Sequence, residues 1–431
     1  MKPVRLMLGA ALLCAIAAPD PARAAGYAIY EQGSAVLGMA GAGTASVNDA
    51  SALFFNPAAL TRVDGTRLYV GSSLLSPTVS FAGMPNYPGY GVTEEMNSQH
   101  FPLPTLYLTH RSAAKWAVGF GVNAPFGLGV DWKNPDTFTG RYIVTKGKLT
   151  TINSTLSLAY ELNPQWSLAA GGNVLLANVE LHNRVQAVVP GGGGAVTDVA
   201  KADLEGDRTP GYGWNAALSF VPGTQWKLGA AYRSKVVVHE DGHADFTQIL
   251  TGNAGFDAAV AASLPPDQNV STVLRFPATW SAGIAFLPAT DWTVEADVNY
   301  VEWKLFSDLP LYFKTTPSAN QTIEENYDNT VQVRVGAEHR LTAFTYRFGY
   351  YFDQGAAPPE SVSPLLPDAD RHGATLGLGM RFGANKQWAL DAYDLALFVN
   401  KRSTEGINRD GYDGEYKTFI NSIGVTAELR W

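Results

Sequence analysis

Hydrophobic residues alternate with polar or small residues along most of the chain, with a period of two. In one such stretch the apolar positions are Leu156, Leu158, Tyr160 and Leu162, and positions 155, 157 and 159 between them carry threonine, serine and alanine. Side chains of a β-strand point alternately to its two faces, so this period predicts strands with one apolar face.

A short turn followed by an aromatic residue recurs along the chain and divides these strands. Five turns lead into Trp116, Trp166, Trp226, Trp292 and Trp388, and a sixth leads into Phe344. Six turns join twelve strands, and the flanking segments 67–81 and 417–431 add two more. The pattern predicts an all-β fold, a transmembrane barrel of about fourteen antiparallel strands with aromatic residues at one membrane interface.

The other connections are long and polar, which is the second feature of a bacterial outer-membrane barrel. We expect loops at 82–100, 127–147, 190–209, 250–270, 307–328, 355–370 and 403–414. The competing interpretation is a secreted β-sandwich, whose strands also alternate. A sandwich does not account for one aromatic-tipped turn that recurs at regular intervals.

Residues 26–60 show neither a strand period nor a helix period. From Gly33 to Ala52, thirteen of twenty residues are glycine, alanine or serine, which are too small to form a core of their own. The segment ends on Asn56-Pro57-Ala58, where proline fixes the backbone and asparagine can bond its own main chain. We therefore predict a hatch or plug at 25–66, enclosed in the lumen of a barrel at 67–431.

Composition supports export to a membrane. Charged residues are 16% of the chain, compared with roughly 25% in soluble domains. Residues 1–24 read as a signal peptide, with a basic start, an apolar centre and an A-x-A cleavage site at Ala22-Arg23-Ala24. The only cysteine, Cys14, lies in this leader. The net charge of −8 argues against nucleic acid as a partner.

Motifs for catalysis or metal binding are weak. His239-Glu240-Asp241-Gly242-His243 matches H-E-x-x-H, but that zinc pattern needs a helix, and the valine-rich flanks favour a strand. The glycine run Gly191–Gly194 is not accompanied by the GxGxxG or GKS/T motif of a phosphate-binding loop. The G-x-S-x-G motif of serine hydrolases is also missing from the sequence. We expect no catalytic residues, no metal and no cofactor. An outer-membrane lipid hydrolase is kept as an alternative of another class.

Pro125 falls in the outer half of the third predicted strand. A closed barrel has no edge strand, so proline there removes a ladder hydrogen bond and bends the strand. The simpler interpretation is that the strand ends at Asn123. The residues alone leave both open.

Several charged side chains are expected to face the lumen because of the alternation. Arg233 and Lys235 lie on one strand, and the others are Arg334, Arg347, Glu295 and Asp297. Such groups usually form a solvated, mutually paired lumen, although a few could meet an anionic head group.

The chain resembles the FadL family of long-chain fatty acid transporters from Gram-negative outer membranes. The start Ala25-Gly26-Tyr27 is similar to the N-terminus of that family, and Asn56-Pro57-Ala58 matches its hatch motif. The segment 123–128 sits where the family has its kinked third strand. Gly211–Ala216 and Tyr232–Val236 are similar to a recognisable strand pair, and the likeness extends along the whole chain.

The resemblance implies a fourteen-strand barrel plugged by its N-terminal hatch, with capture between extracellular loops and sideways release at the kink. The hatch residues expected to gate passage are Gly26, Tyr27, Ile29, Asn56, Pro57 and Ala58. The expected lateral opening is Ala124, Pro125, Phe126 and Gly127. An amphipathic helix at 256–264 could capture the ligand through Phe256, Val260 and Leu264.

One departure concerns the ligand head group. Fatty acid transporters of the family meet the carboxylate with basic residues, whereas Asn183 and Asp328 stand near those positions here. Arg184 is the nearest cation, and Arg233 and Lys235 are the other candidates. Long-chain fatty acids are the first prediction for the substrate, and neutral aromatic or aliphatic hydrocarbons are the alternative.

A diffusion porin for polar solutes and an adhesin or phage receptor remain as rival functions. As partners we expect a hydrophobic small molecule together with outer-membrane lipid and lipopolysaccharide, with the protein acting as a monomer.

Overall fold

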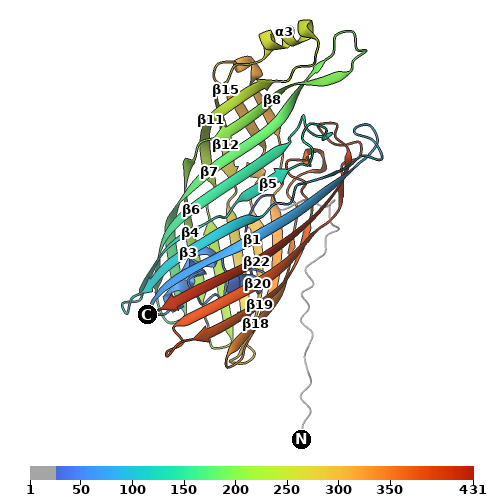
Figure 1. Cartoon of the computed structure of the whole chain (residues 1–431). Helices are drawn as coiled ribbons and strands as arrows, with labels where there is room; N and C mark the ends of the chain where they lie inside the picture. The colour runs from blue at the N-terminus through green and yellow to red at the C-terminus, as the bar shows by residue number, and fades with distance from the viewer. Residues whose placement is uncertain (1–25) are drawn as a thin grey trace.

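The computed structural model describes residues 26–431, so the predicted signal peptide and Cys14 lie outside the described residues. The strands form one sheet that closes on itself, because β1 pairs with β22 as well as with β3. The result is a closed antiparallel barrel of 14 strands (Figure 1). The predicted fold class is confirmed.

Most wall positions are single strands, and several are extended by a second segment beyond a bend. The strands are β1 (Thr66–Gly83), β2 (Thr93–Glu95), β3 (Phe101–Arg111), β4 (Trp116–Asn123), β5 (Gly127–Asp131), β6 (Lys146–Glu161), β7 (Trp166–Val188), β8 (Val196–Gly206), β9 (Thr209–Phe220), β10 (Trp226–Arg233), β11 (Val236–Gln248), β12 (Gln268–Phe276), β13 (Thr279–Phe286), β14 (Trp292–Val301), β15 (Asp308–Phe313), β16 (Gln321–Glu324), β17 (Thr330–Arg340), β18 (Phe344–Asp353), β19 (Arg371–Phe382), β20 (Trp388–Val399), β21 (Arg402–Ser403) and β22 (Gly414–Arg430).

Helices are few and short. Three lie in the N-terminal segment: α1 (Ser34–Leu37), α2 (Ala52–Phe55) and η1 (Pro57–Arg62). The helix α3 (Ala254–Ser263) lies in a long loop, and the remaining 3-10 turns are η2 (Trp303–Leu305), η3 (Pro317–Ala319) and η4 (Pro359–Ser361). Within residues 26–431, none of these helices has the length and apolar character to cross a bilayer.

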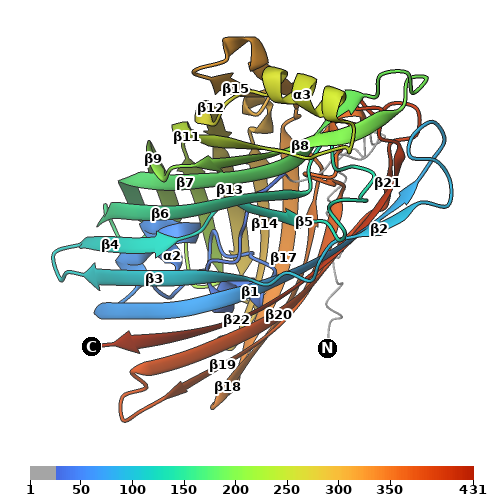
Figure 2. The ribbon, with the colours of Figure 1, turned by 45° about the horizontal axis from the view of Figure 1, so that its top comes forward.

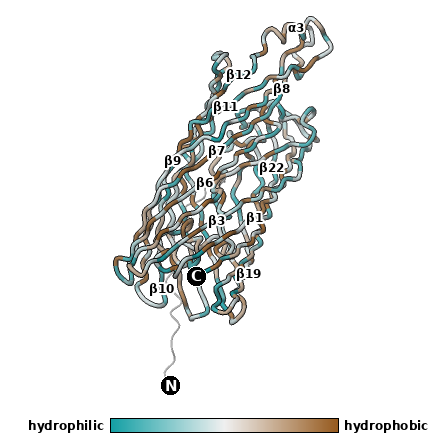
Figure 3. The backbone as a smooth tube through the Cα atoms, turned by 60° about the vertical axis from the view of Figure 1, so that its left-hand side comes forward, coloured by the Kyte–Doolittle hydropathy of each residue, from teal (hydrophilic) through white to brown (hydrophobic). Residues whose placement is uncertain are grey.

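The alternation places apolar side chains outside and polar ones inside, as predicted. Leu156 and Leu158 of β6 are each 57% exposed, whereas Thr155 and Ser157 between them are buried. Hydrophobic and hydrophilic positions are accordingly interleaved along the strands (Figure 3). The exposed apolar side chains suit a lipid environment, where the closed ladder satisfies the backbone.

The six aromatic-tipped turns are confirmed as the short connections at one end of the barrel. Trp116, Trp166, Trp226, Trp292 and Trp388 each begin a strand, and so does Phe344. The C-terminus lies at this end, and α3 lies at the opposite end (Figure 1).

Several predicted long loops contain more structure than expected. The range 190–209 includes β8, which pairs with β7 and β11, and 307–328 includes β15 and β16. The range 127–147 includes β5. These segments extend the barrel walls, and each turns some apolar side chains inward, among them Val130 of β5, Leu204 of β8 and Leu311 of β15. The helix predicted at 256–264 is present as α3.

Residues 26–65 run inside the barrel, where α2 is visible behind the wall strands (Figure 2). Lumen-facing carboxylates hold the backbone of this segment. Asp297 accepts hydrogen bonds from the Gly43 and Thr44 amides, both at 2.9 Å, and Glu295 accepts one from the Ala45 amide at 2.6 Å. These acceptors replace the helix and sheet bonds that a segment of small residues does not supply for itself.

Glycines in the wall let the inserted segment approach closely. A Cβ at Gly229 would lie 2.0 Å from the Thr44 carbonyl oxygen, and one at Gly336 would lie 2.4 Å from the Met39 carbonyl oxygen. The predicted boundaries of leader, hatch and barrel (1–24, 25–66 and 67–431) stay predictions, although β1 begins at Thr66.

Candidate functional site

The third wall position is broken at Pro125. Strand β4 ends at Asn123 and β5 begins at Gly127, so the three residues between them leave the ladder. Proline has no amide hydrogen to donate. Both interpretations from the sequence hold in part, because the strand ends at Asn123 and resumes beyond a bend.

The break leaves an opening between two wall positions. β4 pairs with β3 only over Leu106–Arg111 of β3, and β5 pairs with β6. Within residues 26–431, no ladder joins β5 to the outer half of β3. A bridge between Met96 and Trp132 closes the wall again further out.

The inserted segment supplies the hydrogen bonds that the break releases. The Ile29 amide donates to the Pro125 carbonyl at 2.8 Å, and the Gly127 amide donates to the Tyr27 carbonyl at 3.0 Å. The Gln32 side-chain amide donates to the Ala124 carbonyl at 2.7 Å. The N-terminal segment therefore acts as a short strand along the broken wall.

Thr151 of β6 fixes the break from the other side. Its hydroxyl donates to the Phe126 carbonyl at 2.6 Å and accepts from the Phe126 amide at 3.2 Å. Both backbone groups of Phe126 are thus satisfied without a partner strand, so the bend is a specified feature of the wall.

A cavity fills this opening, and we call it the wall cavity. It encloses about 1720 Å³ of empty space, counting its open mouth. Its apolar lining comes from β1, from the outer half of β3, from the break and β5, from β6 and from the N-terminal segment. It includes Leu75, Phe101, Leu103, Ala124, Phe126 and Ile29.

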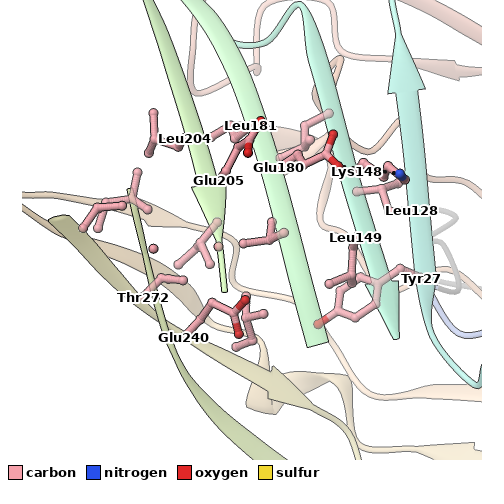
Figure 4. Close-up of a pocket in the computed structure, with 18 of the residues that line it drawn as sticks. Tyr27, Leu128, Lys148, Leu149, Glu180, Leu181, Leu204, Glu205, Glu240 and Thr272 are labelled. Atoms are coloured by element: carbon pink, nitrogen blue, oxygen red, sulfur yellow. Dashed lines mark ion pairs between the residues drawn. The ribbon is translucent and has the colours of Figure 1, made fainter. Parts of the chain in front are cut away.

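A second cavity, the outer pocket, lies above the N-terminal segment on the side of α3. It encloses about 940 Å³ with its mouth and is lined mainly by leucines, Phe276, Phe306 and Tyr327 (Figure 4). Tyr27 forms its inner end, with ring contacts to Trp303 at 4.8 Å and Phe306 at 5.4 Å between centroids.

The two cavities share part of their lining. Tyr27, Leu128, Lys148, Leu149 and Leu366 line both. One residue of the N-terminal segment, Tyr27, thus stands between an apolar pocket open to the loops and an apolar opening in the wall.

Charge in the outer pocket is mostly negative. Its lining includes four glutamates and Asp241 against a single cation, Lys148, which pairs with Glu180 at 3.6 Å. Burial raises the pKa of Glu325, in the loop before β17, to about 8, and Arg409 lowers it only in part. Glu325 therefore binds its proton at neutral pH.

The three predicted head-group cations lie apart from each other. Arg184 is buried and pairs with Asp136 at 2.6 Å. Arg233 lies 3.9 Å from the Phe54 ring centre and lines a third cavity, on the inner side of Phe126. Lys235 is exposed at the bend after β10. Their role toward a ligand stays a prediction.

The predicted hatch residues fall into two groups: Gly26, Tyr27 and Ile29 lie near the break, and Asn56, Pro57 and Ala58 lie at the start of η1. Gly26, with φ +61°, packs under the Trp303 ring, where a Cβ would clash. Asn56 caps the start of η1 by accepting from the Ala58 amide, and it donates to the Thr44 carbonyl at 2.6 Å. Pro57 takes the first position of η1. Of the loop helix, Val260 is buried, while Phe256 and Leu264 are partly buried.

Sequence reasoning missed a row of inward asparagines beside the break. Asn153 donates to Asn123 at 3.2 Å and accepts from Asn173 at 3.1 Å. It also missed Glu240 and Thr272 in the outer pocket. The alternation along the strands does predict that these side chains point inward. It predicts the same for every other lumen-facing residue, so it does not single these out.

A lipid-facing antiparallel barrel with an occupied lumen and a side opening defines a class of protein: the plugged transport barrels of the Gram-negative outer membrane. Comparison with known proteins agrees. A family model described as outer membrane protein transport protein (OMPP1/FadL/TodX) matches residues 15–430. The chain belongs to this family, and it transports hydrophobic compounds across the outer membrane.

Individual relatives are distant but cover nearly the whole chain. A long-chain fatty acid transport protein of Escherichia coli O6:H1 is 25% identical over 418 residues, 91% of each chain. A 47 kDa outer membrane protein of Pasteurella multocida is 25% identical over 95% of each chain.

Solved structures show the same fold. A Pseudomonas aeruginosa FadL homologue aligns with a TM-score of 0.81 at 24% identity, over 94% of this chain and 100% of that one. The Pseudomonas putida toluene transporter TodX aligns with a TM-score of 0.72 at 16% identity, over 95% and 99%.

Proposed function

We propose that the protein imports long-chain hydrophobic molecules, with fatty acids as the first candidate, by capture in the outer pocket and sideways release through the wall cavity. The observation that carries this proposal is the shared lining of the two cavities at Tyr27. A ligand that displaces the first residues of the hatch passes from one apolar surface to the other without full hydration, which would cost free energy in proportion to its apolar area.

The hatch is suited to a limited displacement. Its first residues are bound to the break by a few hydrogen bonds to Ala124, Pro125 and Gly127. Its later part is held by buried carboxylates on the far wall. Movement confined to residues 26–32 would open the route while the rest keeps the lumen closed.

Two candidate substrates fit this route. The fatty acid assignment is supported by the similarity to the long-chain fatty acid transport protein of Escherichia coli. Neutral hydrocarbons are the second candidate, because the single cation that lines the outer pocket already pairs with Glu180. The same proposal includes a first contact of the ligand with α3, a protein that acts as a monomer, and a position beside lipopolysaccharide. It also includes the absence of enzymatic activity.

Filling the opening tests lateral release. We expect the double substitution Leu103→Trp and Ala124→Trp to lower uptake of a radiolabelled fatty acid at least fivefold, because both side chains line the wall cavity. Uptake is measured in cells that lack another fatty acid transporter, and binding to the purified protein should stay within twofold.

The control is Leu106→Trp on the same strand. Leu106 is 40% exposed and lines neither cavity, so uptake should be unchanged. Undiminished uptake by the double variant would rule out release through this opening.

A further inference from the structure

Two polar side chains lie opposite each other in the otherwise apolar outer pocket. Glu240 of β11 and Thr272 of β12 are Cα partners in the ladder, so their side chains emerge on the same face. Both line the pocket (Figure 4). They are 2% and 7% exposed, respectively.

Neither side chain is satisfied by the protein. Across residues 26–431, both carboxylate oxygens of Glu240 and the hydroxyl of Thr272 are buried without a hydrogen-bond partner. Thr209 lies near enough to act on Glu240 through its hydroxyl and its amide. Neither contact has the geometry of a hydrogen bond to Glu240, and the Thr209 hydroxyl donates to the Asp207 carbonyl at 3.3 Å. Buried polar groups nearly always have a hydrogen-bond partner. Two neighbouring polar groups that lack one and face a cavity therefore indicate that a ligand supplies the missing partner.

The surroundings determine the chemistry of that group. Asp207 and Asp241 act on Glu240 with the same sign of charge, and Asp241 pairs with Lys314 at 3.3 Å. Lys148 lies at the other end of the drawn pocket with Glu180 (Figure 4). The remaining titratable groups that line the pocket are Glu205 and Glu325, with the phenols of Tyr27 and Tyr327. Among residues 26–431, the one cation that lines the pocket is therefore Lys148, which is already paired with Glu180.

We propose that Glu240 and Thr272 form a head-group subsite that requires a hydrogen-bond donor on the ligand. The inference rests on the proposed function and specifies its substrate. An aliphatic alcohol donates a hydrogen bond from its hydroxyl to the Glu240 carboxylate. A fatty acid binds with one proton shared between its own carboxyl and that of Glu240, since two carboxylates without a proton repel each other. The proton comes from water, and no covalent bond changes.

Ligands of one size test the subsite. Full-length mature protein in lipid nanodiscs is loaded with the fluorophore N-phenyl-1-naphthylamine, and displacement is measured against protein-free nanodiscs. Decan-1-ol and its isomer 1-methoxynonane differ in the donor alone, and at pH 9, where Glu240 is a carboxylate, we expect the alcohol to bind about tenfold more tightly. Between pH 7 and 9, the affinity for decanoic acid should fall, and near pH 9 the fall should reach about tenfold per pH unit. The affinity for decan-1-ol should change less than threefold over the same range.

Substitutions separate the subsite from general charge effects. Glu240→Gln places an amide donor there, so decanoate should bind at least tenfold more tightly at pH 9 and lose its pH dependence. Thr272→Val should weaken decan-1-ol about threefold and leave 1-methoxynonane unchanged. Glu205→Gln, an exposed carboxyl of the same pocket, and Thr109→Val, a buried unpaired threonine outside it, should match the wild type. Glu325→Gln should keep the preference for decan-1-ol.

Any one of three results would overturn the proposed subsite. In the wild type, these are decanoate binding as tightly as decan-1-ol at pH 9, or decan-1-ol and 1-methoxynonane binding equally. In Glu240→Gln, the third is an affinity change of the same size for all ligands. If the ligands displace the fluorophore equally well, the proposed transport stands and only the head-group inference fails. If none displaces it, the outer pocket is not the capture site and both fall.

Discussion

Single residues decide how closely the hatch and the wall approach each other. Gly229 faces the hatch backbone at a point where a side chain has no room, and Asp297 and Glu295 accept hydrogen bonds from successive hatch amides. A segment of glycine, alanine and serine has no bulky side chains to anchor it. Its position depends on these wall residues.

A side chain at Gly229 should displace the hatch. In Gly229→Ala the new Cβ would lie 2.0 Å from the Thr44 carbonyl oxygen, and overpacking of this kind costs about 1–3 kcal/mol. We expect increased single-channel conductance in planar bilayers, with the heat-resistant barrel retained on gels. Gly172→Ala is the control, since its Cβ would meet only an oxygen at 3.9 Å. Equal conductance in both variants would contradict this account.

At the scale of elements, the break between β4 and β5 shows how a closed barrel holds an opening without losing its ladder. Pro125 prevents continuous pairing, but the N-terminal segment and Thr151 satisfy the groups around it. The sequence predicted a bend or an end at this point. It did not indicate that residues 27–29 pair with the bend, because that contact joins segments about a hundred positions apart.

Removing the Thr151 hydroxyl should loosen the break. Thr151→Val leaves both backbone groups of Phe126 without that partner, which costs about 1–3 kcal/mol. We expect hydrogen exchange of the Phe126 amide to accelerate at least fivefold, with exchange in the centre of β6 unchanged. Thr150→Val on the exposed face of the same strand is the matched control. Unchanged exchange at Phe126 would mean that the hatch alone holds the bend.

At the scale of the whole molecule, the barrel and its insert make separate contributions. Consecutive wall strands pair from β1 to β22 and back, so closure does not use the hatch. The apolar outer surface and aromatic-tipped turns insert the barrel into lipid. In the proposed function, the hatch makes this pore a selective route.

Deletion of residues 27–60 tests this division. The barrel should still assemble in the outer membrane, and cells should become sensitive to large polar antibiotics because the lumen is open. Uptake of fatty acid at low concentration should be lost. A diffusion porin would instead keep its selectivity without this segment, so unchanged antibiotic sensitivity would favour that rival.

The sequence by itself determined the barrel, the number of its strands, the ends at which its turns and loops lie, and the presence of a plug. Those features follow from local patterns: a period of two, turns of fixed length and a segment too small to form a core. The tertiary structure alone decided the outer pocket, the pairing of the hatch with Pro125 and the placement of Glu240 opposite Thr272. These depend on the register between distant strands and on which lumen side chains meet across the barrel, and alternation states only that a side chain points inward.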